Sequence, residues 1–463
     1  MDVAQWMDPD RRPKRIVFFG IDGGRGDYLE RFEAPVMRGL AERGVGFRNA
    51  IASNGLAETA AGFASMATGL RTSGHGVLTS REWYDRDTGR LIYVYDEETG
   101  EMHMDAPTVI QRIKETKPDL RVASISTKDR LAILLPGGSA DLVAYSYREH
   151  VFHRHAKGSY TGRGVGEEAY KFTERTGREL PSYLQEMSAP RRVNWSGPGF
   201  DHPGEDIADT ALIDLFIADG ALAILERERP DILFVGLVAV NIVGHKWGPE
   251  SAEIAECFGE TDRQIGRVVD YLKSRGELDE TLFIVTADHG MSVKPNVIDI
   301  TKELLERAGD KLVENIAYTF AGSAGGLYLK DPRPEAIEET LAAVRGVPHV
   351  LGAWWKDDPE APWFVKRIAH PNTFDILIVP ERDWVIVDPG VEEVNVMAHH
   401  GPPFPPDLSI VQIFSGAGIR PAGLVGDLLD MEGRALMTQE EIEGLPEQTD
   451  VAHLLLKMYG VEE

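Results

Sequence analysis

IVFFGIDGG, at residues 16–24, is the stretch of the sequence that decides the fold class. Its apolar run is short, uninterrupted and rich in β-branched and aromatic side chains, which predicts a strand buried on both faces of a parallel sheet. Asp22 follows the strand directly and precedes two glycines. Open α/β sheets place their sites at the carboxyl ends of their strands. Asp22 is therefore a candidate site residue, although a turn or helix-capping aspartate would have the same local sequence.

Comparable apolar runs recur along the chain, with helical patterns between them. The runs cover residues 121–127, 231–240, 281–287 and 408–414, and the clearest helical pattern covers residues 249–273. Strands that alternate with helices predict an α/β fold, with a doubly wound, mostly parallel sheet and helices on both faces.

Two stretches interrupt this alternation and set the expected domain organisation. Residues 148–205 are rich in Gly, Pro, Arg and His and predict an irregular cap segment, whereas residues 325–388 predict a smaller α+β insert. We expect an N-terminal tail at 1–14, the main core at 15–324, the insert at 325–388 and a return to the core at 389–463.

The composition predicts a globular chain with a strongly acidic surface. The 463 residues include 49 Lys and Arg against 75 Asp and Glu, a formal charge of −26, and the one cysteine excludes an intrachain disulfide. A nucleic-acid polymer is an unfavourable partner, because its binding depends on basic residues that displace counterions. Residues 1–15 lack the apolar core of a signal peptide, and no apolar run reaches the length of a membrane span. We expect a cytoplasmic protein without a membrane partner, and the sequence leaves a homo-oligomer open.

Further Asp and His residues lie at other predicted strand ends. Asp288 and His289 follow the run 281–287, Asn241 and His245 follow the run 231–240, and the pair His399-His400 precedes the run 408–414. Each motif alone is typical of an ordinary turn. Their convergence on one edge of a sheet is hard to explain by capping, and carboxylate with imidazole suits a divalent cation such as zinc.

Thr59 is the candidate nucleophile, in the segment AETAAGFASMATGL at 57–70. The small residues that follow predict a helix whose first turn begins near Thr59. A hydroxyl there would meet the free N–H groups at the positive end of the helix, where a phosphoryl group binds well. A structural N-cap threonine would have the same sequence, and the two roles are compatible.

In this order, the motifs resemble the alkaline phosphatase superfamily, in its nucleotide pyrophosphatase/phosphodiesterase and phosphonoacetate hydrolase branch. The resemblance implies Thr59 as nucleophile and two divalent metal ions, Zn²⁺ foremost with Mn²⁺ as the alternative. Its implied metal ligands are Asp22, Thr59, Asp288, His289, Asn241, His245 and His400, with His399 as the weaker choice for the last position. The family has an aspartate where this chain has Asn241. The metal site to which Asn241 belongs thereby loses a negative charge, unless another carboxylate such as Glu58 replaces it.

The segment STKDRLAILL at 126–135 narrows the resemblance. It is similar to the Lys-Asp-Lys-Leu segment of phosphonoacetate hydrolases, in which two basic residues hold the substrate carboxylate. Lys128 and Arg130 are the corresponding residues, and an ordinary charged turn remains an equal interpretation. The family's phosphoryl-binding asparagine is missing, and Thr79 or Ser80 would replace it as donor.

The resemblance implies a metal-dependent hydrolase of a small anionic phosphonate or phosphate ester, similar to phosphonoacetate hydrolase, with a phospho-threonine intermediate. A phosphodiesterase or nucleotide pyrophosphatase is the first alternative, and it would need an aromatic slot that Trp83, Tyr84 or Trp247 could supply. A non-catalytic binder of a phosphorylated ligand is the alternative from another class, which Asn241 favours. A sulfatase is excluded, because its nucleophile derives from cysteine or serine.

Overall fold

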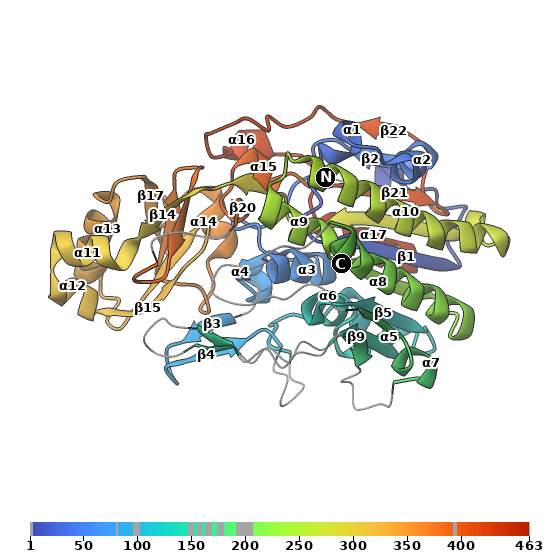
Figure 1. Ribbon diagram of the computed structural model, residues 1–463, viewed down its shortest axis with the longest axis horizontal. Helices are drawn as coiled ribbons and strands as arrows, with labels where there is room; N and C mark the ends of the chain where they lie inside the picture. The colour runs from blue at the N-terminus through green and yellow to red at the C-terminus, as the bar shows by residue number, and fades with distance from the viewer. Residues whose placement is uncertain are drawn as a thin grey trace.

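The computed structural model describes residues 3–79, 82–95, 102–146, 152–154, 160–162, 169–173, 180–190, 207–391 and 396–462. Figure 1 shows a large sheet with helices around it and a smaller sheet with its own helices at one end of the molecule, drawn in yellow and orange. The predicted α/β fold with helices on both faces of a mostly parallel sheet is confirmed. No described helix combines the length and the apolar character that a membrane crossing requires.

The large sheet has ten strands among the described residues. In spatial order they are β10 (Ser188–Pro190), β9 (Ala169–Thr173), β6 (Leu142–Ser146), β5 (Val122–Ser126), β11 (Ile232–Leu237), β1 (Arg15–Ile21), β12 (Thr281–Ala287), β21 (Gln412–Gly416), β2 (Gly44–Phe47) and β22 (Gly423–Val425). The central run from β6 to β12 is parallel, and β21 is antiparallel to both of its neighbours. Strand β1 is buried along nearly its whole length, as its apolar run predicts.

Two groups of helices cover this sheet. The helices of one group pack against one another; they are α2 (Pro35–Arg43), α8 (Ile207–Arg227), α9 (Ala239–Trp247) and α10 (Ala252–Ser274). The other consists of α3 (Thr59–Thr68), α5 (Val109–Thr116), α6 (Asp129–Leu134) and α17 (Thr449–Tyr459). Because β5 contacts both α8 and α6, the groups lie on opposite faces, which is the doubly wound arrangement.

The smaller sheet has the order β15 (Ile316–Phe320), β16 (Gly325–Leu329), β18 (Ile376–Pro380), β17 (Val350–Trp355) within the described residues. Helices α11 (Ile300–Ala308), α12 (Asp310–Glu314), α13 (Pro334–Arg345) and α14 (Trp363–Ile368) lie in the same part of the chain. Strand β15 precedes residue 325, so this sheet begins earlier than the predicted insert. The side chains of β15 are all half-buried, and its short run IAYTF gave too weak an apolar signal for its prediction.

The remaining described elements are short. They are α1 (Tyr28–Arg31), α4 (Thr72–His75), β3 (Glu82–Asp85), β4 (Arg90–Tyr93), β7 (Phe152–Arg154), β8 (Tyr160–Gly162), α7 (Ser182–Gln185), β13 (Ser292–Val293), β14 (Asn296–Asp299), β19 (Trp384–Val387), β20 (Ala398–His399), α15 (Pro405–Leu408) and α16 (Gln439–Ile442). Of the predicted irregular segment 148–205, the described strands β9 and β10 extend the main sheet, and much of the rest lies outside the described residues.

Three element boundaries differ from the sequence predictions. The apolar run 231–240 divides into β11 and the first residues of α9, and the run 408–414 begins with the end of α15, so β21 starts only at Gln412. The predicted helix 249–273 is α10, shifted by a few residues because Ser251 caps its N-terminus by accepting a hydrogen bond from Ile254 N. An apolar run cannot distinguish a buried strand from a buried helix that follows it.

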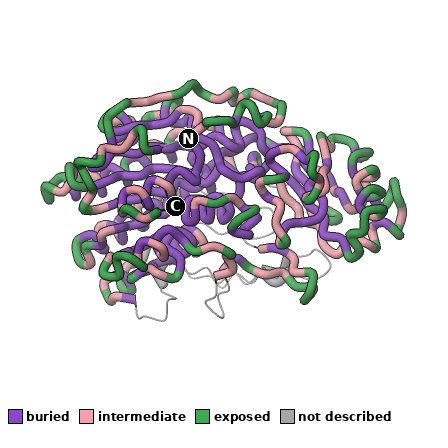
Figure 2. The backbone as a smooth tube through the Cα atoms, turned by 180° about the vertical axis from the view of Figure 1, so that it is seen from behind, coloured by how far each residue is buried: buried purple, intermediate pink, exposed green. Residues whose placement is uncertain are grey.

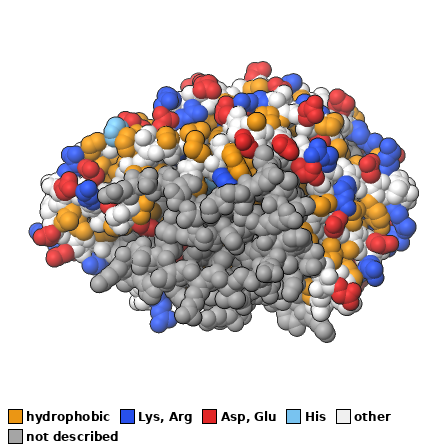
Figure 3. Space-filling model, in the orientation of Figure 1, with side chains coloured by type: hydrophobic (Ala, Val, Ile, Leu, Met, Phe, Trp, Pro, Cys, Tyr) orange, Lys and Arg blue, Asp and Glu red, His pale blue; other side chains and the backbone are white. Residues whose placement is uncertain are grey.

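Apolar side chains form a core under each sheet and a third cluster between them. The main cluster lies around β1, β11 and β12, and another lies inside the smaller sheet. The cluster between the sheets joins Leu56 and Ala57 of the main part to Ala324 and Phe374 of the smaller part. Figure 2 shows buried backbone running through the middle of the molecule. On the face drawn in Figure 3, basic and acidic side chains are interspersed over the described surface.

Candidate metal and nucleophile site

The register of three neighbouring strands brings the predicted ligands to one edge of the main sheet. Strand β1 lies between β11 and β12, and Ile21 is paired with Leu237 on one side and with Ala287 on the other. Asp22 directly follows the last residue of β1, and Asp288 directly follows the last residue of β12. Because parallel strands end at the same edge, the two carboxylates become neighbours, and α9 begins beside them at Ala239.

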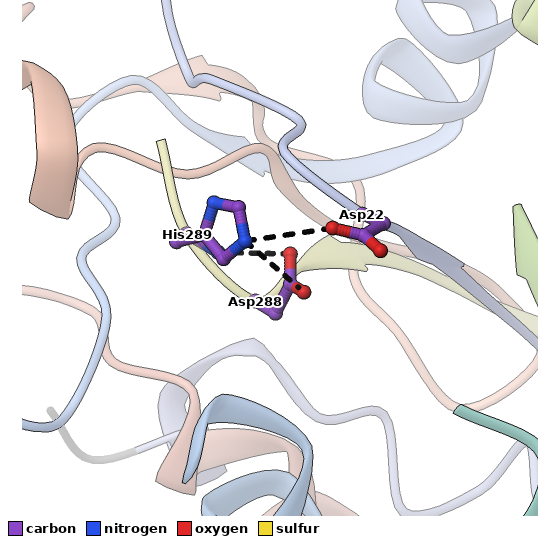
Figure 4. Close-up of side chains that lie close together, drawn as sticks. All are labelled: Asp22, Asp288 and His289. Atoms are coloured by element: carbon purple, nitrogen blue, oxygen red, sulfur yellow. Dashed lines mark hydrogen bonds and ion pairs between the residues drawn. The ribbon is translucent and has the colours of Figure 1, made fainter. Parts of the chain in front are cut away.

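Asp22, Asp288 and His289 form a compact, fully buried cluster. Figure 4 shows the three side chains converging. One ligand atom from each lies within 4.8 Å of the others, and His289 Nε2 lies 3.4 Å from Asp22 Oδ1 and 3.5 Å from Asp288 Oδ2. Those two carboxylate oxygens are buried and accept no hydrogen bond from the described residues. A divalent cation would satisfy both, and the donor set of two carboxylates and one imidazole fits zinc or manganese.

The pKa values of Asp288 and His289 also suit a site that binds a cation. Burial and the charge of Asp22 raise the pKa of Asp288 to about 7. Burial would lower the pKa of His289, but the charges of Asp288 and Asp22 raise it to about 9. A bound cation would take the place of the His289 proton, since a ligating histidine must be neutral.

Gly23 orients Asp288 and allows α9 to approach the cluster. Its backbone N–H donates a hydrogen bond of 3.0 Å to Asp288 Oδ1, and its φ of +74° is a conformation that favours glycine. A Cβ at this position would lie 3.1 Å from Asn241 Cα and 3.2 Å from Asn241 Cβ. The glycine after Asp22 is thus needed for the contact between the β1 loop and the helix that carries Asn241.

Thr59 is the first residue of α3 and lies against the cluster. Its Oγ1 is 3.3 Å from His289 Nε2, and its side chain is buried. The N-cap residue is Glu58, so the alternative of a structural N-cap threonine is wrong. A Cβ at Gly62, one turn further on, would lie 2.8 Å from the backbone oxygen of Asp288. The small residues of α3 therefore let its N-terminus approach the carboxyl end of β12.

His245 and His400 share a hydrogen-bond pattern with His289. Their Nδ1 atoms lie 2.7 Å from the carbonyl oxygens of Ala398 and Ala57, and His289 Nδ1 lies 2.8 Å from the carbonyl oxygen of Gly290. A backbone acceptor at Nδ1 fixes the proton there and leaves Nε2 as the ligand atom, which is the usual arrangement of metal-binding histidines. Burial lowers the pKa of both His245 and His400 well below its ordinary value, which keeps them neutral.

The second predicted ligand set is Asn241, His245 and His400. Asn241 and His245 lie four residues apart on α9, hence on one face of the helix. The His400 ring is stacked on His289 at 3.4 Å between centroids and lies 5.4 Å from the ring of His245. Asn241 Oδ1 is buried and accepts no hydrogen bond from any described residue, so it is available to a cation.

His400, rather than His399, faces the cluster. The His399 ring is 5.2 Å from that of His245, and its residue pairs with Ser292 in the short β13–β20 ladder. Burial and the charge of Lys294 lower the pKa of His399 to about 4. The geometry agrees with the predicted preference for His400.

Lys128 lies closer to the cluster than predicted. It is the N-cap residue of α6, and its Nζ forms an ion pair and hydrogen bond with Asp22 Oδ2. Burial would raise the pKa of Asp22, but the Lys128 charge and the contact with His289 hold it well below the ordinary value. The contact places the ammonium beside the predicted metal ligands, and the role of Lys128 in holding a substrate carboxylate stays a prediction. Sequence spacing could not show this contact, because it joins residues 106 positions apart.

Two other predicted substrate-binding residues contact their own neighbours in the chain. Arg130 Nη1 lies 3.5 Å from Asp129 Oδ1. The Thr79 hydroxyl donates a hydrogen bond of 2.6 Å to the carbonyl oxygen of Glu82, so its proton is engaged within a turn and is not available to a substrate. Ser80 lies outside the described residues.

Asp214, on α8, is a buried residue that the motifs did not reveal. Its Oδ1 accepts hydrogen bonds from Val238 N (2.8 Å) and Ala239 N (3.1 Å), and its Oδ2 accepts one from Thr261 Oγ1 (2.8 Å). It therefore holds the first turn of α9, which carries Asn241. A sequence signal existed, since this acid interrupts the apolar run TALIDLFIA at 210–218.

The sequence profile of the type I phosphodiesterase / nucleotide pyrophosphatase family matches residues 16–403. The chain belongs to this family. The matched range includes every predicted ligand and the nucleophile, and the family lies within the alkaline phosphatase superfamily that the motifs indicated.

Relatives and solved structures support the same class. The chain is 24% identical over 480 residues to alkaline phosphatase PhoK of a Sphingomonas species, covering 88% of this chain and 84% of the relative. The crystal structure of alkaline phosphatase PafA matches with a TM-score of 0.73 and 18% identity, over 97% of this chain and 96% of that one. A further PafA structure carries substitutions at a threonine, an asparagine, a lysine and an arginine.

Phosphonoacetate hydrolase from Sinorhizobium meliloti 1021, in complex with phosphonoformate, has a similar fold. It matches with a TM-score of 0.61 and 19% identity, over 96% of each chain. The family and these relatives identify the protein as a metal-dependent phosphoester hydrolase, as predicted. Enzymes of the alkaline phosphatase superfamily use divalent metal ions, and the Asp22, Asp288 and His289 cluster could hold one.

Proposed function

We propose that the protein hydrolyses small phosphate monoesters through a phospho-Thr59 intermediate, with Zn²⁺ as the preferred metal. The observation that carries this proposal is the contact between Lys128 Nζ and Asp22. A buried ammonium next to the metal cluster would meet the oxygens of a phosphoryl group bound there. It favours a terminal phosphoryl group with two negative charges over a diester with one.

The comparison with PafA also supports a role of the basic residues in binding a phosphoryl group. In the substituted PafA, the lysine and the arginine are two residues apart, as Lys128 and Arg130 are here. Its asparagine lies as far beyond its threonine as Ser80 lies beyond Thr59. These two spacings support a PafA-like assignment of Lys128, Arg130 and Ser80 over one of the phosphonoacetate type.

The aromatic residues offer little support for the diesterase alternative. The Trp83 ring is buried and lies edge-on to His103 at 5.8 Å. The ring of Tyr84 is stacked on that of Tyr318 at 5.6 Å within the cluster between the two sheets. Lys246 Nζ lies 4.2 Å from the centroid of the Trp247 ring. All three rings are thus already engaged in packing.

In the proposed reaction, the Thr59 hydroxyl loses its proton to solvent, and its Oγ1 forms a bond to phosphorus while the bond to the leaving oxygen breaks. The leaving group takes the electron pair and a proton from solvent. When bound, the divalent cations would favour the threonine alkoxide and neutralise the phosphoryl oxygens. The free N–H groups at the start of α3 and the Lys128 ammonium hold those oxygens. Water then attacks phosphorus, Thr59 is released, and inorganic phosphate leaves.

The test compares three substrates in zinc- or manganese-supplemented assays: 4-nitrophenyl phosphate, bis(4-nitrophenyl) phosphate and phosphonoacetate. We expect the highest kcat/KM on the monoester. Lys128→Met should lower kcat/KM for the monoester by about 10- to 100-fold, the equivalent of one charge-assisted hydrogen bond, and less for the diester.

Lys14→Met is the matched control, because Lys14 pairs with Glu280 at the surface and lies at the opposite end of β1. It should leave all three rates unchanged. Turnover of phosphonoacetate alone would restore the phosphonate hydrolase assignment, and turnover of the diester alone would establish the phosphodiesterase. Full metal occupancy without turnover of any of the three would favour the non-catalytic binder.

A further inference from the structure

Ser323 is a buried residue of the smaller sheet that lies beside the second ligand set. It belongs to the turn between β15 and β16, and its side chain is 2% exposed. Its hydroxyl has no hydrogen-bond partner among the described residues. Leaving a buried hydroxyl unpaired costs about 1–3 kcal/mol. Such a group in a site is best explained by a hydrogen bond to a bound molecule.

The backbone around Gly401 determines what Ser323 faces. Gly401 has a φ of +148°, and an added Cβ would lie 3.4 Å from Ser323 Cβ and 3.5 Å from Glu58 Oε1. The backbone of Gly401 is therefore approached by a serine from the smaller sheet and a carboxylate from the N-terminus of α3. His400 directly precedes Gly401, and Glu58 directly precedes Thr59. The region around Gly401 thus lies next in the chain to both the second ligand set and the nucleophile.

We propose that Ser323 Oγ donates a hydrogen bond to the oxygen that leaves phosphorus, and that the attacking water later occupies the same position. This inference rests on the proposed function. Two-metal sites stabilise the attacking oxygen at one cation and the leaving oxygen at the other. Thr59 lies at the first ligand set, and Ser323 lies at the second, on the side of His400.

The Ser323 hydroxyl and the Glu58 carboxylate near Gly401 suit an alcohol or a water molecule as hydrogen-bond partner. When the bond between phosphorus and the leaving oxygen breaks, that oxygen takes the electron pair and becomes negative. The Ser323 hydroxyl can donate to it, and the alcohol acquires its proton from solvent. In the second step, the entering water can donate a hydrogen bond to the Glu58 carboxylate and accept one from the Ser323 hydroxyl.

The test measures kcat/KM for methyl phosphate, phenyl phosphate and 4-nitrophenyl phosphate with the zinc-loaded Ser323→Ala variant. A donor to the leaving oxygen matters most for the poorest leaving group, because that oxygen carries the most charge in the transition state. We expect a loss on the order of 100-fold for methyl phosphate. The loss should decrease through phenyl phosphate to 4-nitrophenyl phosphate, while zinc content stays at the wild-type value.

Ser415→Ala is the matched control. Ser415 is also buried with a hydroxyl that has no partner among the described residues, but it pairs with Phe283 in the middle of β12, away from Asp288. This variant should keep all three rates. With an active wild type, an equal loss on the three esters, or no loss, would overturn the role of Ser323. A wild type that hydrolyses none of them would overturn the proposed function itself, and the inference with it.

Discussion

Replacing Asp214 by asparagine should make the folded protein more stable above pH 6 and leave its fold intact. Burial raises the pKa of Asp214 from its ordinary value of 3.8 to about 6, against the hydrogen bonds that act to lower it. An acid whose pKa is raised on folding contributes stability that is present below its unfolded pKa and is lost as pH rises through its folded pKa. The loss therefore develops between about pH 4 and pH 6.

The size of the change in stability follows from the shift in the pKa of Asp214. About two pKa units correspond to about 3 kcal/mol once the carboxylate is ionised. Asparagine cannot ionise, yet its Oδ1 can still accept from Val238 N and Ala239 N, which both donate to the same oxygen of Asp214. Its amide can donate to Thr261 Oγ1, whose hydroxyl then acts as acceptor. The variant should thus lose the charge and keep its contacts with Val238 N, Ala239 N and Thr261 Oγ1, while the Thr261 hydroxyl proton loses its acceptor.

The assay is urea unfolding of the metal-free wild type and variant, in chelator, across pH 4 to pH 8. The variant should gain about 3 kcal/mol relative to the wild type over this range, and most of the gain should appear below pH 6.5. Asp214→Ala is the comparison, because it removes the acceptor of both amides and should destabilise the protein at every pH. A difference between wild type and Asp214→Asn that is constant with pH would refute the reasoning.

Three further changes test the site itself. Thr59→Ala should abolish turnover and phosphoenzyme formation while the metal content measured by mass spectrometry stays near that of the wild type; activity like the wild type would remove Thr59 as nucleophile. Gly23→Ala should reduce metal occupancy and cost about 1–3 kcal/mol of unfolding free energy, because its Cβ meets Asn241 and its φ is positive; an unchanged melting temperature would show that the loop adapts. Asn241→Asp should tighten binding of the second metal in a zinc titration, and an unchanged affinity would argue against Asn241 as a ligand.

Sequence reasoning was most successful where a local pattern decides the structure. The apolar runs that became β1, β5, β11 and β12 are short and bounded by turns, and their ends carry the Asp and His residues. Sequence order alone does not show that Asp22 and Asp288 become neighbours. The parallel register of β1 and β12 places them there.

Contacts that depend on the packing of distant segments could not be predicted. Lys128 reaches Asp22 because α6 begins at the edge of the sheet, and Ser323 reaches Gly401 because the smaller sheet packs against the main one. Motif spacing carries no information on either approach. Asp214 was detectable in principle, since a lone acid in an apolar helix is stable only when it is hydrogen-bonded.

The charges of the buried site explain how an asparagine can stand where the family has an aspartate. Asp22 and Asp288 contribute two carboxylates to the first ligand set, but one of them is already paired with the Lys128 ammonium. The second set, Asn241 with His245 and His400, has no charge of its own when the histidines are neutral. A cation held there keeps most of its positive charge, which makes the site a stronger binder of a doubly charged phosphoryl group and a weaker binder of metal. Because linkage is reciprocal, the phosphoryl group and the second cation must then strengthen each other's binding. Under the proposed function, the same feature that weakens the metal site would therefore favour monoesters over diesters as substrates.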